Sequence, residues 1–174
     1  EDLIDKIIFI NGQEYFNNYK HEQVELDEKL QIHIKEKVHD VYWEIFYNEI
    51  NSDPPKFDKL FNLVEELRNS FCNFIPNNKK IQEEIHDHID VDLFKNMILH
   101  KAFDDNDLRK FAVYVISLIK RFQPPDMDKS VNEWEDKLLQ EFQKGFNYAE
   151  FLTSFFRSIF NMIDTIKEYI KKLK

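Results

Sequence analysis

Apolar side chains recur three or four positions apart along most of the chain, which is the spacing of one face of an α-helix. The first long stripe lies between Asp27 and about Ile50. It consists of Leu30, Ile34, Val38, Val41 and Ile45, and it is widened by Tyr42, Phe46 and Ile50. This region is therefore predicted to form a long amphipathic helix.

Prolines and polar residues end the first two helices. Pro55 disfavours helical backbone at the residue before it, so the first helix is expected to stop in residues 51–55. Asp53 is then placed to cap the second helix, with Pro54 in its first turn. The second helix repeats the apolar spacing and stops before Pro76.

Aspartates mark the starts of two later helices. After a smaller helix around residues 81–89, Asp90 is expected to cap a fourth helix, and Asp104 or Asp105 a fifth. The fifth helix is apolar on more than half of its circumference, which predicts a central position. The pair Pro124-Pro125 ends it.

The last two predicted helices are separated by Gly145, whose residue type predicts a C-cap. The final helix runs to the end of the chain and carries many large apolar side chains, among them Phe151, Phe155, Phe156 and Phe160. The sequence leaves three alternatives for what covers this apolar face: the rest of the chain, a further C-terminal part or a second copy of the chain. We therefore take the four phenylalanines as interaction candidates and the final helix as a candidate homo-oligomer contact.

The first residues depart from the helical pattern. Lys6-Ile7-Ile8-Phe9-Ile10 followed by Asn11-Gly12 is typical of a short extended segment with a hairpin turn, while a frayed helix or an extended arm across the bundle fits nearly as well. We divide the chain into an N-terminal arm, residues 1–26, and a helical bundle, residues 27–174. The first residue is Glu1 rather than Met, which indicates an excised fragment.

Composition narrows the function classes. The chain has only 2 glycines, and most hairpin turns, phosphate-binding loops and nucleophile elbows depend on glycine. The net charge of -9 and the interleaving of basic with acidic residues argue against a nucleic-acid partner. No apolar run reaches the length of a transmembrane segment, and the single cysteine, Cys72, fits a reducing compartment, so we expect a cytoplasmic protein.

His86, His88, Asp90 and Asp92 are weak candidates for a metal site. Alternating His and Asp bind a metal ion when a loop or strand turns them one way, so one alternative function is a metal-dependent hydrolase centred on this segment. On a helix, however, side chains two positions apart point about 200° from each other, so His86 and His88 do not share an ion. Capping and helix-end interactions explain these residues, and we predict no metal, no cofactor and no catalytic residue.

His39 and Trp43 are four positions apart on the first predicted helix and are therefore neighbours in space. They form either a docking spot for a partner or a stacked, hydrogen-bonded core pair. We favour the core pair, and we keep both residues as interaction candidates.

The motif Val38-His39-Asp40-Val41-Tyr42-Trp43-Glu44, followed by Asn51-Ser52-Asp53-Pro54-Pro55, resembles the T-complex 11 family. The same order continues through Leu60-Phe61-Asn62-Leu63-Val64-Glu65-Glu66-Leu67-Arg68, Phe74-Ile75-Pro76, Glu84-Ile85 and Ile89-Asp90-Val91-Asp92-Leu93. The likeness extends from residue 8 to residue 131 and so covers most of the chain. Asp126-Met127 depart from it, because the family usually has a basic residue after the proline matched by Pro125.

The resemblance implies a role in signalling and no enzymatic activity. Family members are considerably longer, are linked to cyclic-AMP and protein kinase A signalling and to male fertility, and have no accepted enzymatic activity. The resemblance therefore supplies no catalytic residues, and it implies a protein partner in the protein kinase A pathway.

Together these observations predict an all-α fold, an irregular antiparallel bundle of six to eight helices within a larger family domain. We expect it to act as a non-catalytic helical interaction module in intracellular signal transduction. The alternatives are the metal-dependent hydrolase and a self-associating structural scaffold piece.

Overall fold

The computed structural model describes the backbone of residues 2–174 and the side chains of residues 21–174. The chain divides into two compact units, the first ending at Glu44 and the second running from Ile45 to Lys174. The described backbone contains seven α-helices, one 3₁₀ turn and no strand, so the predicted all-α fold is confirmed. Among these helices, none combines the length and the apolar character needed to cross a lipid bilayer.

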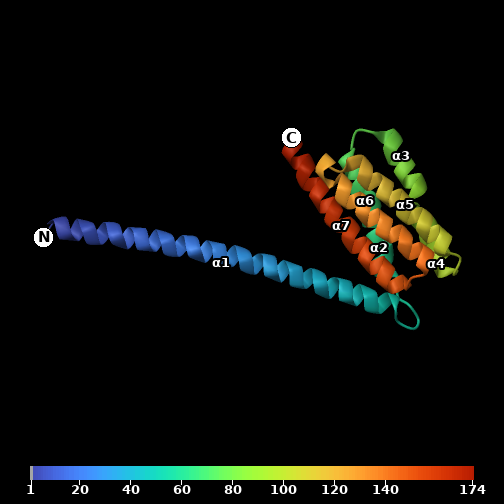
Figure 1. Ribbon diagram of the computed structural model, residues 1–174, viewed down its shortest axis with the longest axis horizontal. Helices are drawn as coiled ribbons and strands as arrows, with labels where there is room; N and C mark the ends of the chain where they lie inside the picture. Colours follow the sequence, from blue (N-terminus) through green and yellow to red (C-terminus); the bar gives the residue numbers. More distant parts are fainter. Residues whose placement is uncertain (1) are drawn as a thin grey trace. The chain divides into compact units, whose positions relative to one another are not determined.

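The elements follow one another with short connections (Figure 1). Their bounds are α1 Asp2–Ile50, α2 Asp58–Phe74, α3 Lys79–His88, α4 Val91–Leu99, α5 Asp105–Phe122, η1 Pro125–Met127, α6 Asp128–Lys144 and α7 Tyr148–Leu173.

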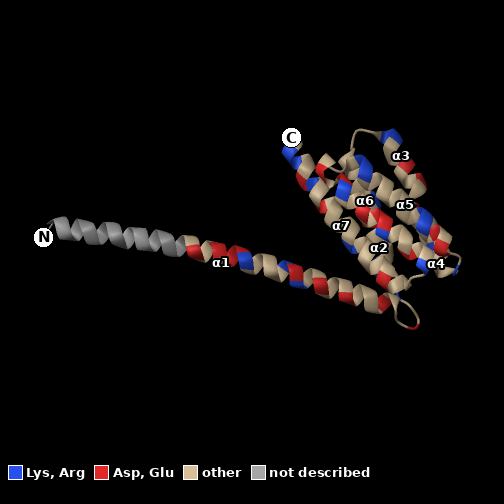
Figure 2. Cartoon of the chain, in the orientation of Figure 1, with Lys and Arg blue, Asp and Glu red and all other residues tan. Residues whose placement is uncertain are grey.

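The start of α1 corrects one prediction. Because α1 begins at Asp2, the backbone forms no hairpin at Asn11-Gly12 and no extended arm. The side chains of residues 1–20 lie outside the described residues. From residue 21 onward, acidic and basic side chains occur along the whole of α1 (Figure 2).

The apolar stripe of α1 is more exposed than its spacing predicts. Leu30, Ile34 and Val38 are each more than half exposed, whereas Phe46 and Ile50 near the C-terminal end of the helix are buried. Phe46 and Ile50 belong to the second unit, where other helices surround them. The stripe farther upstream lies in a unit built from α1, which holds no second helix to cover it.

The loop between α1 and α2 overturns a predicted cap. Asp53 lies in this loop, and α2 begins only at Asp58. The two prolines at Pro54 and Pro55 explain the delay, since a residue before a proline avoids the helical region. Ser52 instead closes α1, because its hydroxyl donates a hydrogen bond of 2.7 Å to the carbonyl oxygen of Glu49.

Three other predicted helix ends are confirmed. The Asp90 carboxylate accepts the Leu93 N–H at 3.0 Å and caps α4. Asp104 caps α5 through a capping box with Asp107, in which each carboxylate accepts the other residue's N–H. Gly145 follows α6 with a φ of 89°, a conformation that favours glycine.

The core of the second unit lies between α2, α5 and α7. Figure 1 shows α5, α6 and α7 running in alternating directions, and α2 packs against α3, α4 and α7. The central position predicted for α5 is confirmed, because its buried residues are Leu108, Ala112, Val115, Ile116, Leu118 and Ile119. The chain itself covers the large apolar face of α7, whose fully buried residues include Phe155, Phe156, Ile159, Ile163 and Ile166.

Candidate interaction site

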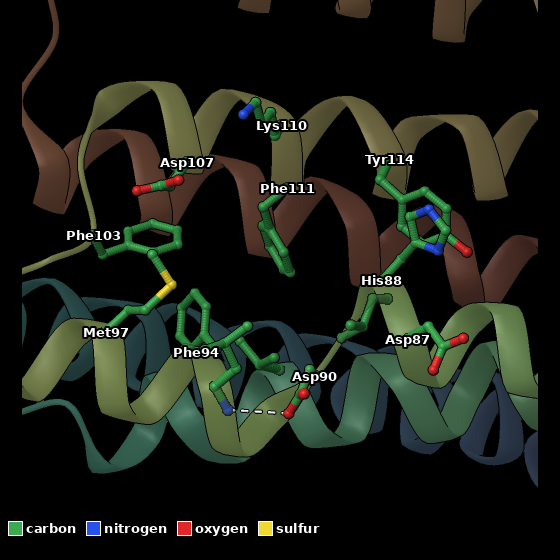
Figure 3. A pocket seen from close by; sticks show the side chains of 13 residues that line it. Asp87, His88, Asp90, Phe94, Met97, Phe103, Asp107, Lys110, Phe111 and Tyr114 are labelled. Carbon is green, nitrogen blue, oxygen red and sulfur yellow. Dashed lines mark hydrogen bonds between the residues drawn. The ribbon is translucent and has the colours of Figure 1, made fainter.

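An open cavity of about 300 Å³ lies between α3, α4 and α5, with one wall residue from α2 (Figure 3). We call it the α4–α5 cavity. Its apolar lining consists of Val64, Ile89, Leu93, Phe94, Met97, Phe103 and Phe111. Its polar lining consists of Asp87, His88, Asp90, Asp107, Lys110 and Tyr114.

The short helix α4 and the turn after it shape this cavity. The Ala102 N–H donates to the Met97 carbonyl oxygen at 2.8 Å, which ends α4 in a Schellman-type turn. Lys101 adopts the left-handed conformation that this turn requires, with a φ of 54°. The chain then returns toward α4, so that the Phe103 ring packs edge-on against Phe94 with 5.0 Å between the ring centroids.

A stacked pair of rings, His88 on Tyr114, closes one end of the cavity (Figure 3). The ring centroids lie 4.3 Å apart and the ring planes are 12° from parallel. The His88 Nδ1 lies 2.9 Å from the carbonyl oxygen of Glu84. Because a carbonyl oxygen only accepts, Nδ1 carries a proton and donates to it.

The Tyr114 hydroxyl is buried and has no hydrogen-bond partner among the described residues. Burial, and after it the nearby Glu84 carboxylate, raises the pKa of Tyr114 to about 12. The hydroxyl is therefore neutral at physiological pH and is no nucleophile.

The rim of the cavity carries more negative than positive charge. It holds the carboxylates of Asp87, Asp90 and Asp107 and one ammonium group, that of Lys110. Two of these carboxylates, Asp90 and Asp107, are held in place by their helix-capping hydrogen bonds. A partner that approaches the cavity therefore meets acidic groups whose positions are largely fixed.

A second cavity of about 340 Å³ adjoins the first and shares Phe94 and Phe103 with it. Its lining is mostly apolar and includes Leu60, Ile98 and Leu152. Phe94 and Phe103 therefore form a common wall between two apolar depressions.

The four residues considered for a metal site, His86, His88, Asp90 and Asp92, do not converge on one point in the structure. His86 and Asp92 are exposed, His88 stacks on Tyr114, and Asp90 caps α4. Among the described side chains, no group of three or more His, Cys, Asp or Glu residues is arranged to hold a metal ion. The structure does bring His88 and Asp90 together at the α4–α5 cavity, with a structural role for each.

The candidate phenylalanines of α7 lie mainly in the core. Phe151, Phe155 and Phe156 are buried, and Phe160 is half-buried. The Trp134 ring of α6 stacks on Phe155 with the centroids 5.9 Å apart. The buried three are therefore occupied by contacts within the unit and offer no surface to a partner.

The predicted core pair of α1 does not form. Trp43 is only 8% exposed, and its ring packs edge-on against Tyr42 with 5.0 Å between centroids. His39 is exposed, so it is not the buried partner of Trp43 that the spacing favoured. Cys72 is half-buried, and burial raises the pKa of its thiol, which lowers the fraction of reactive thiolate.

Sequence reasoning missed the residues that shape the α4–α5 cavity, above all Leu93, Phe103 and Tyr114. One signal was available, since Phe103 is a lone aromatic residue in an otherwise polar connection between two predicted helices. Nothing in the apolar spacing of α4 distinguishes Leu93, which is 55% exposed, from its buried neighbour Phe94.

Comparison with known proteins covers most of the chain. The family model described as T-complex protein 11 matches residues 10–168. The chain belongs to the T-complex protein 11 family. The resemblance inferred from the sequence motifs is thus confirmed, and every residue that lines the α4–α5 cavity lies within the T-complex protein 11 match.

One curated member of the T-complex protein 11 family gives the scale of the likeness. The T-complex protein 11 homolog of Homo sapiens is 26% identical over 119 residues, which are 68% of this chain and 23% of the human protein. The matched region thus spans about a quarter of the human protein's length. No solved structure matches the chain. The T-complex protein 11 family is not a known enzyme family.

Proposed function

We propose that this chain is a non-catalytic helical interaction module of a cytoplasmic signalling protein. Through a protein partner it modulates cyclic-AMP and protein kinase A signalling, with a role in male fertility. Membership of the T-complex protein 11 family supports the choice of pathway. The α4–α5 cavity supports the mode of action, which is the binding of a protein segment.

The open, aromatic-walled cavity is the observation that carries this proposal. Its volume of about 300 Å³ suits one or two large apolar side chains and lies at the small end for a drug-sized ligand. Leu93 is 55% exposed beside it, so apolar surface continues outside the cavity. A protein segment that inserts one side chain and covers Leu93 would bury both surfaces.

The pathway is tested by direct binding. The purified chain is titrated separately with purified regulatory and catalytic subunits of protein kinase A in a calorimeter, and the cyclic-AMP dependence of the kinase holoenzyme is measured with and without the chain. We expect one subunit to bind and the cyclic-AMP concentration for half-activation to shift. Absence of binding to both subunits, together with an unchanged activation curve, removes a direct action on protein kinase A.

A further inference from the structure

We propose that the α4–α5 cavity receives a basic amphipathic helix from a partner protein. An apolar side chain of that helix enters between Phe94, Phe103 and Phe111, and its lysines or arginines lie over the acidic rim. This inference names the partner chemistry for the proposed interaction module and therefore rests on that function.

The shape of the surface favours a helix over a small molecule. The α4–α5 cavity has an apolar wall beneath its polar rim, and it shares the part of that wall formed by Phe94 and Phe103 with its mostly apolar neighbour. Successive apolar side chains on one face of a helix lie about 5–6 Å apart, so a helix that inserts one side chain into the α4–α5 cavity can cover Leu93 with the next. A free ligand that filled one depression would leave the other, and the exposed Leu93, uncovered.

Charge determines which kind of amphipathic helix fits. The rim carries three carboxylates against the single ammonium group of Lys110. The stretch from Glu83 to Asp92 contains two of these rim acids and three more, Glu83, Glu84 and Asp92, and neither lysine nor arginine. Of the additional three, Glu84 is paired with Arg121 at 3.0 Å, whereas Glu83 and Asp92 are exposed and add to the negative charge of this side. Complementary positive charge on the partner would speed association and select against acidic helices.

The acidic rim is also preorganised. Asp90 and Asp107 keep their carboxylates in place because each accepts a backbone N–H at the start of a helix. Because these hydrogen bonds already hold the two carboxylates, binding a basic helix requires little rearrangement of the rim.

The test uses a designed peptide as the probe. It is a fluorescent peptide of about 18 residues with apolar residues on one helical face and lysine on the other. A twin peptide carries glutamate in place of lysine, and a third has the same composition in an order without an apolar face. We expect anisotropy to show binding of the lysine peptide, with the other two at least about tenfold weaker.

Two matched pairs of variants locate the binding site. Leu93→Arg places a cation beside the cavity, and Leu99→Arg makes the same change at a leucine of α4 that is 62% exposed and lies outside the cavity lining. We expect the first to weaken binding of the lysine peptide at least about tenfold and the second less than about twofold.

The second pair isolates charge. Asp87→Lys reverses a rim charge near the C-terminal end of α3, where a cation also suits the helix dipole, so folding is expected to persist. Asp136→Lys reverses an exposed acid of α6, away from the cavity. We expect Asp87→Lys to weaken binding about threefold or more, with a larger loss at low salt, while Asp136→Lys matches the unmodified chain. Circular dichroism checks that all four variants are folded.

The outcomes separate this inference from the proposed function. Equal binding of the lysine and glutamate peptides, or equal loss in Leu93→Arg and Leu99→Arg, overturns the basic-helix inference. A dimer that Leu93→Arg dissociates would assign the cavity to a second copy and also overturn it. Binding of the lysine peptide as predicted, without binding to either kinase subunit, leaves the inference standing and defeats the proposed pathway. A kinase subunit that binds the Leu93→Arg variant as tightly as the unmodified chain supports the proposed pathway and overturns docking of that partner at the cavity.

Discussion

The second unit contains two aromatic clusters that differ in what covers them. The closed cluster consists of Phe151, Phe155 and Phe156 of α7 with Trp134 of α6, and its three phenylalanines are buried. The open cluster consists of Phe94, Phe103 and Phe111, which line the α4–α5 cavity (Figure 3). The closed cluster is thus sealed, whereas in the open cluster Phe94 is buried but Phe103 and Phe111 are only half-buried beside the cavity.

The two clusters are in contact and both consist of aromatic side chains. Side-chain chemistry alone therefore does not explain why one is sealed and the other borders a cavity. Phe111 of α5 lies 5.6 Å from Phe94 and 6.3 Å from Phe155, centroid to centroid. What differs is the covering element. The closed cluster lies between helices of 17 and 26 residues, whereas the open one is covered by α4, a helix of nine residues that ends in a turn. In this unit the open cluster is the one beneath the short helix and its turn.

The largest expected effect comes from truncating one ring of each cluster. Phe155→Ala removes a ring that is fully buried and should lower the free energy of unfolding by about 3–5 kcal/mol, because a cavity replaces packed atoms. Phe103→Ala removes a half-buried ring from an existing cavity wall and should cost about 1–2 kcal/mol. Urea denaturation of both variants measures the difference. Equal losses would mean that the two clusters are packed alike.

A smaller effect comes from the caps of the helices that carry the two clusters. Asp90 caps α4 and Asn147 caps α7, each accepting a backbone N–H at 3.0–3.1 Å. Alanine at either position should cost about 1 kcal/mol. Because α4 is short, we expect Asp90→Ala to speed amide hydrogen exchange throughout residues 91–99. Asn147→Ala should affect only the first turn of α7. Unchanged exchange in α4 of Asp90→Ala would show that packing alone holds it.

The smallest effect concerns Tyr114 at the end of the open cluster. Its pKa is about 12, above the ordinary value of 10.0, so its contribution to stability is complete below pH 10 and is lost as the pH rises to about 12. Tyr148 has a pKa raised to about 12 by burial and by its hydrogen bond to Asp105. In an ultraviolet titration, Tyr114→Phe should therefore remove one late-ionising tyrosine and leave Tyr148 as another.

The same variant tests the unpartnered hydroxyl at neutral pH. Because the Tyr114 hydroxyl makes no hydrogen bond to a described residue, Tyr114→Phe should change the free energy of unfolding by less than about 0.5 kcal/mol. A loss well above this value, or a Tyr114 that ionises near pH 10, would place that side chain in a different environment.

Local sequence signals predicted the helices well. Apolar spacing located α2, α5 and α7, and the caps at Asp90 and Asp104 and the glycine at Gly145 were read from residue type alone. Each of these features depends on groups within one helical turn. Asp53 failed as a cap for a local reason too, because the following Pro54-Pro55 delays the helix.

Burial was harder to predict, because it depends on contacts between segments distant in the sequence. The spacing of Leu30, Ile34 and Val38 resembles that of the α7 stripe, yet the first set is exposed and the second is buried. The cavity was missed for the same reason. It arises where a turn after α4 returns Phe103 to the side of Phe94, an arrangement that helical periodicity does not encode.

The chain contains three methionines, which provide the most direct test of the docking site. Met97 lines the α4–α5 cavity, whereas Met127 lies in η1 and Met162 in α7, both outside its lining. Carbon-13 labelling of the methionine methyl groups allows each to be followed by nuclear magnetic resonance while the lysine peptide is added. We predict that the Met97 signal shifts to saturation and that the other two remain in place. Saturable shifts of Met127 or Met162 with a stationary Met97 would contradict docking at this cavity.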